Sequence, residues 1–200
     1  RRYLTEHAIR TAGPLTPSVA EARKGLETLK RLNGWPGIID DRHLTALADL
    51  MDDPLPVLFP LRQLPYTLLH TDPAPERWRL TLFDDHYLLD WHKSAIGPGV
   101  YDLVSFIDHF ELLLDERFIG QNRRLRMTEE TMVDSYILAM RGEMGTQFDA
   151  RATRLAIPAA RCLLVLTHWL PRHAQWLREL PFDQEAWQTM GKLSDDELIN

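Results

Sequence analysis

The sequence predicts a mainly helical domain of the α+β class with one small β-hairpin. In segments towards both ends of the chain, apolar residues recur every three or four positions, which is the spacing of one face of an α-helix. In the middle, two short apolar runs, residues 78–83 and 86–91, are separated by Asp84 and Asp85, which are common turn residues. We therefore expect helices on both sides of a central hairpin.

The first part of the chain contains helix signals and then a series of prolines. Residues 1–12 are expected to be the end of a helix that stops at Gly13-Pro14. Residues 17–32 are expected to form a second helix that stops at Asn33-Gly34. A third helix is expected from Asp40 or Asp41 to residue 50. Pro54, Pro56 and Pro60 are then expected to break the helical pattern, before an apolar strand that leads into His70.

The part after the hairpin is predicted to be helical throughout. We expect helices over residues 100–114, 128–144 and 184–190. Residues 148–180 form the most apolar segment, which contains Pro158 and Pro171. It should be one bent helix or two helices.

Three aspartates are placed where a site could form. Asp72 follows the end of the strand that leads into His70, Asp90 lies at the end of the hairpin, and Asp102 lies near the start of the next helix. Carboxylates at neighbouring strand ends can hold a metal ion and position phosphate groups. The segment that contains them, residues 68–103, is therefore the candidate site.

The composition excludes several other classes of protein. The chain has 200 residues, of which 44% are hydrophobic and 26% charged, and its net charge is −6, without the basic stripe of a nucleic-acid-binding surface. No apolar run is long enough to span a membrane, so we expect no membrane partner. The single cysteine, Cys162, has no cysteine partner for an internal disulfide. A cytoplasmic location is the expectation that follows.

The order of short motifs in the candidate site resembles that of a known enzyme family. They are His70-Thr71-Asp72, Pro75, Leu89-Asp90-Trp91, Gly97-Pro98-Gly99 and Tyr101-Asp102-Leu103. Together they are similar to the aminoglycoside phosphotransferase and choline kinase branch of the protein-kinase-like fold. That branch has His-Gly-Asp, His-Pro-Gly-Asn, a hairpin, Ile-Asp-Trp, Gly-Asp-Pro and Tyr-Asp-Leu in the same order.

The resemblance implies a fold and a reaction. The chain would be one domain, the helical C-terminal lobe of a kinase-like fold, and the N-terminal nucleotide lobe would be absent from it. Residues 1–66 would form a helical entry segment, residues 67–103 the catalytic loop, hairpin and metal loop, and residues 104–200 a helical subdomain. The reaction would transfer the γ-phosphate of ATP or GTP, with Mg²⁺, to a hydroxyl group of a small molecule.

The resemblance also assigns roles to individual residues. Asp72 would accept or orient the proton of the acceptor hydroxyl, His70 would be a scaffold residue of the catalytic loop, and Asp90 would hold Mg²⁺. Asp102 would brace the loop by accepting hydrogen bonds from its backbone N–H groups. On the helix after the hairpin, Asp108 and Glu111 are either a solvated acidic flank or a patch for a cationic acceptor.

One position departs from the family pattern. Arg77 stands where the family has the asparagine that binds the metal, and a guanidinium has no acceptor atom for a cation. It could pair with Asp90 and take the metal's place, or bind a phosphate oxygen directly. The sequence thus leaves two principal functions open: an active phosphotransferase, or a degenerate kinase-like protein that binds a ligand or partner without turnover. A helical interaction domain with a chance motif match is a third hypothesis, and a metallohydrolase lacks the necessary histidine spacing.

Overall fold

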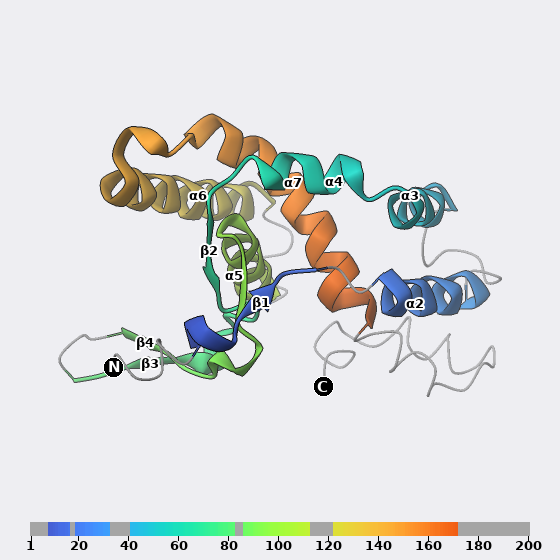
Figure 1. Ribbon diagram of the computed structural model, residues 1–200, viewed down its shortest axis with the longest axis horizontal. Helices are drawn as coiled ribbons and strands as arrows, with labels where there is room; N and C mark the ends of the chain where they lie inside the picture. Colours follow the sequence, from blue (N-terminus) through green and yellow to red (C-terminus); the bar gives the residue numbers. More distant parts are fainter. Residues whose placement is uncertain (1–7, 17–18, 33–40, 83–85, 113–121, 172–200) are drawn as a thin grey trace. The chain divides into compact units, whose positions relative to one another are not determined.

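The computed structural model describes residues 8–16, 19–32, 41–82, 86–112 and 122–171, and the predicted α+β class is confirmed (Figure 1). The chain divides into two compact units. One comprises residues 1–17 and 54–165, and the other residues 18–53 and 166–200. The motifs of the candidate site all lie in the first unit.

The second unit contains a pair of helices, α2 (Val19–Leu32) and α3 (Asp41–Asp52), which pack against each other. Ala22 and Leu26 of α2 are buried, as are Leu44 and Met51 of α3. Arg23 donates hydrogen bonds to the carbonyl of Met51 and the carboxylate of Asp52. Both helices were predicted from their apolar spacing, and the structure confirms them.

A three-stranded sheet leads to the candidate site. Its order is β1 (Gly13–Pro14), β5 (Ala95–Pro98) and β2 (Tyr66–Leu69). β5 runs parallel to β1 and antiparallel to β2, so that Leu69 at the end of β2 lies opposite Ala95 at the start of β5. The expected strand before His70 is confirmed, whereas β5 was not foreseen because its sequence, AIGP, reads as a turn. This sheet places residues 70–72 next to the segment that follows the hairpin.

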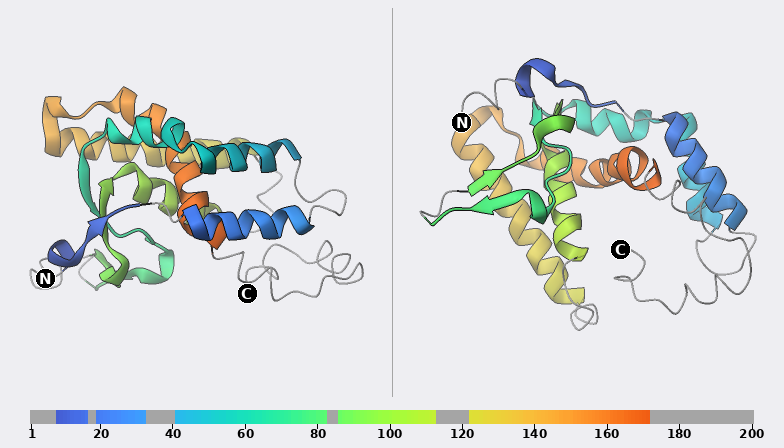
Figure 2. Two further views of the ribbon diagram at one scale, coloured as in Figure 1. Left: turned by 45° about the vertical axis from the view of Figure 1, so that its right-hand side comes forward. Right: turned by 90° about the horizontal axis from the view of Figure 1, so that it is seen from below.

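The hairpin is confirmed, but it is shorter than predicted. Strands β3 (Trp78–Leu80) and β4 (His86–Leu88) pair antiparallel, with Arg79 opposite Tyr87. One 3₁₀ turn, η1 (Pro75–Arg77), precedes β3, and another, η2 (Trp91–Lys93), separates β4 from β5. Asp84 and Asp85 lie outside the described residues. The hairpin and α4 (Leu55–Arg62) lie at opposite sides of this unit (Figure 2, left).

The remaining helices form the core of the first unit. They are α4, α5 (Val100–Leu112), α6 (Asn122–Met144) and α7 (Ala150–Leu164), with a 3₁₀ turn, η4 (Gly145–Gln147), before α7. α7 packs against both α4 and α5 and buries Ala156, Ala160 and Leu163. Asp149 caps α7 by accepting hydrogen bonds from the backbone N–H groups of residues 151 and 152. A π-helical segment, η5 (Val165–Trp169), follows.

The expectation of a proline-broken segment at residues 54–60 is wrong, because α4 forms there. Pro56 lies in the first turn, where a backbone N–H has no partner within the helix, so its absence costs little. Pro60 lies inside α4, and burial of Val57 and Leu61 stabilises the helix in spite of it. α6 also begins six residues before the predicted start at Thr128. The predicted helix over residues 184–190 lies outside the described residues.

Candidate active site

Asp102 braces the loop that carries Asp72. It lies in the first turn of α5 and accepts the backbone N–H of His70 through Oδ2 at 2.6 Å and that of Thr71 through Oδ1 at 2.8 Å. These are the backbone hydrogen bonds expected for Asp102. Burial raises the pKa of this carboxyl group, although the two hydrogen bonds act in the opposite direction. The loop is thereby fastened to α5 at the two residues before Asp72.

Two residues of the site adopt left-handed backbone conformations. Thr71 has φ = 72° and Asp90 has φ = 69°. For a β-branched residue such as Thr71 this region is strained by about 1–3 kcal/mol. The two hydrogen bonds that hold Thr71, from its N–H to Asp102 and from its hydroxyl to the carbonyl of Lys93, offset that strain. These conformations turn the chain sharply at Thr71 and Asp90, and so help to set the directions of the Asp72 and Asp90 side chains.

His70 links the loop to the hairpin. Only 1% of it is exposed, and its Nε2 lies 2.7 Å from the carbonyl oxygen of Leu89. Because a carbonyl only accepts, Nε2 carries the proton, and Nδ1 then accepts from the backbone N–H of Asp72 at 3.4 Å. The ring also packs edge-on against Trp91. With both nitrogens engaged by the backbone, His70 is arranged as a scaffold residue.

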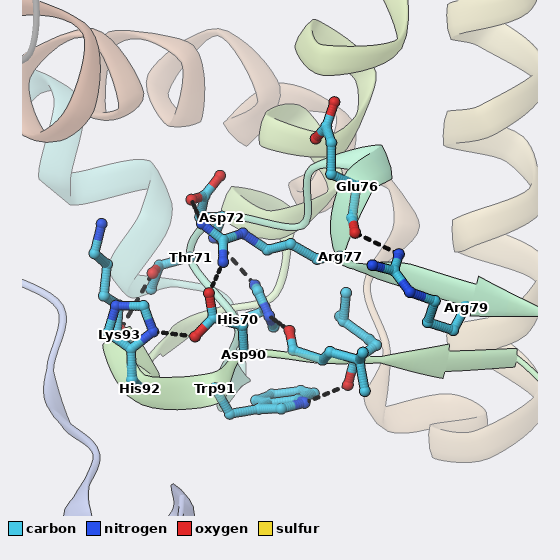
Figure 3. A network of polar contacts seen from close by, with 12 residues as sticks. His70, Thr71, Asp72, Glu76, Arg77, Arg79, Asp90, Trp91, His92 and Lys93 are labelled. Atoms are coloured by element: carbon cyan, nitrogen blue, oxygen red, sulfur yellow. Dashed lines mark hydrogen bonds and ion pairs between the residues drawn. The ribbon is translucent and has the colours of Figure 1, made fainter.

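Arg77 connects the two aspartates (Figure 3). Its Nη2 donates to Oδ2 of Asp72 at 2.6 Å, and its Nη1 forms an ion pair with Oδ2 of Asp90. The structure thus brings Asp72 and Asp90 together on one guanidinium. Asp72 is the more buried of the two, with 13% of its side chain exposed against 40% for Asp90. We call this arrangement the Asp72–Arg77–Asp90 bridge.

Two histidines complete the surroundings of the bridge. Nδ1 of His92 contacts Oδ1 of Asp90, and Nε2 of His109, on α5, lies 3.2 Å from Oδ1 of Asp72. Neither contact was predicted from the sequence. His109 follows Asp102 by seven residues, which is two helical turns, so the two side chains share one face of α5. This seven-residue spacing from Asp102 could have indicated that His109 belongs to the site.

Asp108 and Arg79 have contacts with residues outside the bridge. Asp108 is 3.7 Å from Arg161 of α7, whose guanidinium also contacts Glu129 at 3.0 Å. Asp108 therefore shares the single positive charge of Arg161 with Glu129, which lies closer to it. Glu111 lies in α5, but its side chain is outside the described residues. Arg79 donates to the carbonyls of Glu76 and Trp78, away from the carboxylates (Figure 3).

The bridge does not fit the Mg²⁺ ion that the resemblance implies. Mg²⁺ requires oxygen ligands in near-octahedral geometry, whereas Arg77 offers donors alone and points them at both carboxylates. Within the described ranges, no group of three or more His, Cys, Asp or Glu residues could hold a metal ion. We therefore derive no chemical step through a metal.

Comparisons of this chain with protein-family models, with curated proteins and with solved structures gave no match. Among the helices that the structure describes, none combines the length and the apolar character needed to cross a membrane.

Proposed function

We propose that the chain is the C-terminal lobe of a small-molecule phosphotransferase of the aminoglycoside phosphotransferase type. The enzyme would transfer the γ-phosphate of ATP or GTP to a hydroxyl group. One observation carries the proposal: Asp72 and Asp90, which come from two different turns, converge on a single guanidinium in a loop that Asp102 braces. Phosphoryl transfer asks a protein mainly to position groups and to stabilise charge, and a braced pair of carboxylates serves that purpose.

In this proposal Asp72 acts on the acceptor. His109 fixes Oδ1 of Asp72 and Arg77 fixes Oδ2, so the carboxylate keeps one orientation. A carboxylate oxygen takes the proton of the acceptor hydroxyl while the acceptor oxygen bonds to the γ-phosphorus and the nucleoside diphosphate leaves. Arg77 contacts Asp72 at 2.6 Å, and after turning from Asp90 its guanidinium can bind a phosphate oxygen.

Turnover of the full-length protein tests this role. The protein is incubated with γ-labelled ATP or GTP and a set of hydroxyl acceptors that includes cationic amino sugars and amino alcohols. Asp72→Asn keeps the shape of the side chain but removes its basicity, so turnover should fall by about 10²-fold or more. Asp134→Asn is the matched control, because Asp134 is an exposed aspartate of α6 paired with Arg154. If Asp72→Asn retains the turnover of that control, Asp72 is not the base.

The bridge also favours a second candidate function, a kinase-like protein that binds a ligand without turnover. With Arg77 on both carboxylates, the proton acceptor and the metal ligand are neutralised by the same side chain. This candidate predicts saturable nucleotide binding in titration calorimetry and no label transfer to any acceptor. Label transfer by the unmodified protein would exclude it.

A further inference from the structure

A pocket of about 240 Å³ lies between the start of β2, the start of α5 and the facing side of α6, away from the Asp72–Arg77–Asp90 bridge. α6 contributes Tyr136, Met140 and Met144, which recur every four residues and therefore share one helix face. Phe148 adds a second aromatic ring, which packs edge-on against that of Tyr136 at 6.4 Å between centroids. Gly99 and Thr67 also line the pocket and lie next to each other.

The walls select for a neutral and mostly apolar occupant. None of the described residues that line the pocket carries a charge. Methionine side chains are flexible and polarisable, so they adapt to an aromatic or aliphatic guest. An apolar cavity of ~150 Å³ is large enough for benzene, so this pocket has room for a single ring with one substituent.

Tyr136 is one of four hydroxyl-bearing residues among those described as lining the pocket, with Tyr66, Thr67 and Thr153. Tyr136 is half-buried, and within the described part of the chain its hydroxyl makes no hydrogen bond to another residue. It lies directly against Gly99, since a Cβ at residue 99 would be 2.6 Å from Tyr136 Oη. Burial and the nearby Asp102 raise the pKa of Tyr136 to about 12, so it is a donor at neutral pH.

We propose that this pocket binds a small neutral molecule of about one aromatic ring, held by Met140, Met144 and Phe148 and by a hydrogen bond from Tyr136. This inference does not depend on the phosphotransferase proposal, because it concerns a different set of residues and requires no turnover.

Phenol is the probe, and toluene is the control that has the same ring without a hydroxyl. The full chain, labelled at its methionine methyl groups, is titrated with each compound and followed by NMR. We expect saturable shifts of the Met140 and Met144 signals, with a Kd on the order of 1 mM for phenol. Tyr136→Phe should weaken phenol binding about fivefold, which is the loss of one neutral hydrogen bond, and leave toluene binding unchanged.

Met140→Trp should fill the pocket and abolish binding of both probes. Leu138→Trp is its control, because Leu138 lies on the same helix with 73% of its surface exposed. If Met140→Trp does not fold, the phenol and toluene titrations of Tyr136→Phe are sufficient to test the proposed binding. Absence of saturable shifts at Met140 and Met144, or an equal effect of Tyr136→Phe on the two probes, would overturn the proposal.

Discussion

Asp102→Asn should loosen the loop that carries Asp72. Asp102 accepts two backbone N–H groups, and an asparagine keeps one acceptor oxygen but turns its NH₂ group towards the other N–H. A hydrogen bond to a charged group contributes about 1.5–3 kcal/mol, and a buried N–H left without a partner costs about 1–3 kcal/mol. Burial disfavours the charged carboxylate of Asp102 and raises its pKa, so replacing it with a neutral amide recovers part of the lost stability. We expect a net loss of about 2 kcal/mol in the free energy of unfolding.

Asp149→Asn is the matched control for this prediction. Asp149 also accepts two backbone N–H groups, at 2.8 and 2.9 Å, but at an exposed helix start where asparagine is an equally good cap. Urea unfolding gives the global loss of stability, and hydrogen exchange of the His70 and Thr71 N–H groups reports on the loop itself. If Asp102→Asn costs no more stability than Asp149→Asn and these N–H groups stay protected, Asp102 does not brace the loop.

Two further predictions concern single residues near the loop. Thr71→Gly should leave the free energy of unfolding unchanged or raise it by up to about 1 kcal/mol. Glycine removes the strain at φ = 72°, but the hydrogen bond from the Thr71 hydroxyl to the carbonyl of Lys93 is lost. A loss of more than about 1 kcal/mol in urea unfolding would show that this hydrogen bond outweighs the strain. Tyr136 should ionise in the folded protein near pH 12, about two pH units above an ordinary tyrosine. Because the folded state holds this proton more tightly than the unfolded state, the resulting contribution to the free energy of unfolding is complete below about pH 10. It is lost as the pH rises through 12. Phenolate absorbance of Tyr136→Phe should therefore lack a step near pH 12 that the unmodified protein shows, and loss of a step near pH 10 instead would contradict the assignment.

The sequence predicted the elements whose signals are local. Apolar spacing indicated α2, α3 and α5, and Asp84-Asp85 between two apolar runs indicated the hairpin. α4 was missed because its prolines outweighed its apolar residues, although Pro56 lies where proline is tolerated. β5 was missed because a strand rich in glycine and proline depends on pairing with β2, which no local signal shows.

The candidate site could be predicted in part. The order of the motifs indicated that Asp72, Asp90 and Asp102 belong together, and the departure at Arg77 indicated two possible partners for its guanidinium. The sequence did not indicate that Arg77 would contact both aspartates. That depends on the left-handed conformation of Asp90 and on the 3₁₀ turn that carries Arg77. His109 lies 37 residues from Asp72 along the chain, and the packing of α5 beneath the loop brings them together.

We propose that Arg77 lies where a phosphotransferase of this type binds its metal ion. Titration calorimetry of the full-length protein with Mg²⁺–ATP, in parallel with Arg77→Asn, tests it most directly. Arg79→Asn is the control, because it removes a neighbouring guanidinium that contacts backbone carbonyls. We predict that Arg77→Asn frees Asp90 and supplies an amide oxygen, so that affinity rises by at least about tenfold, or about 1.4 kcal/mol. An affinity for Mg²⁺–ATP that is the same in Arg77→Asn, Arg79→Asn and the unmodified protein would contradict the claim.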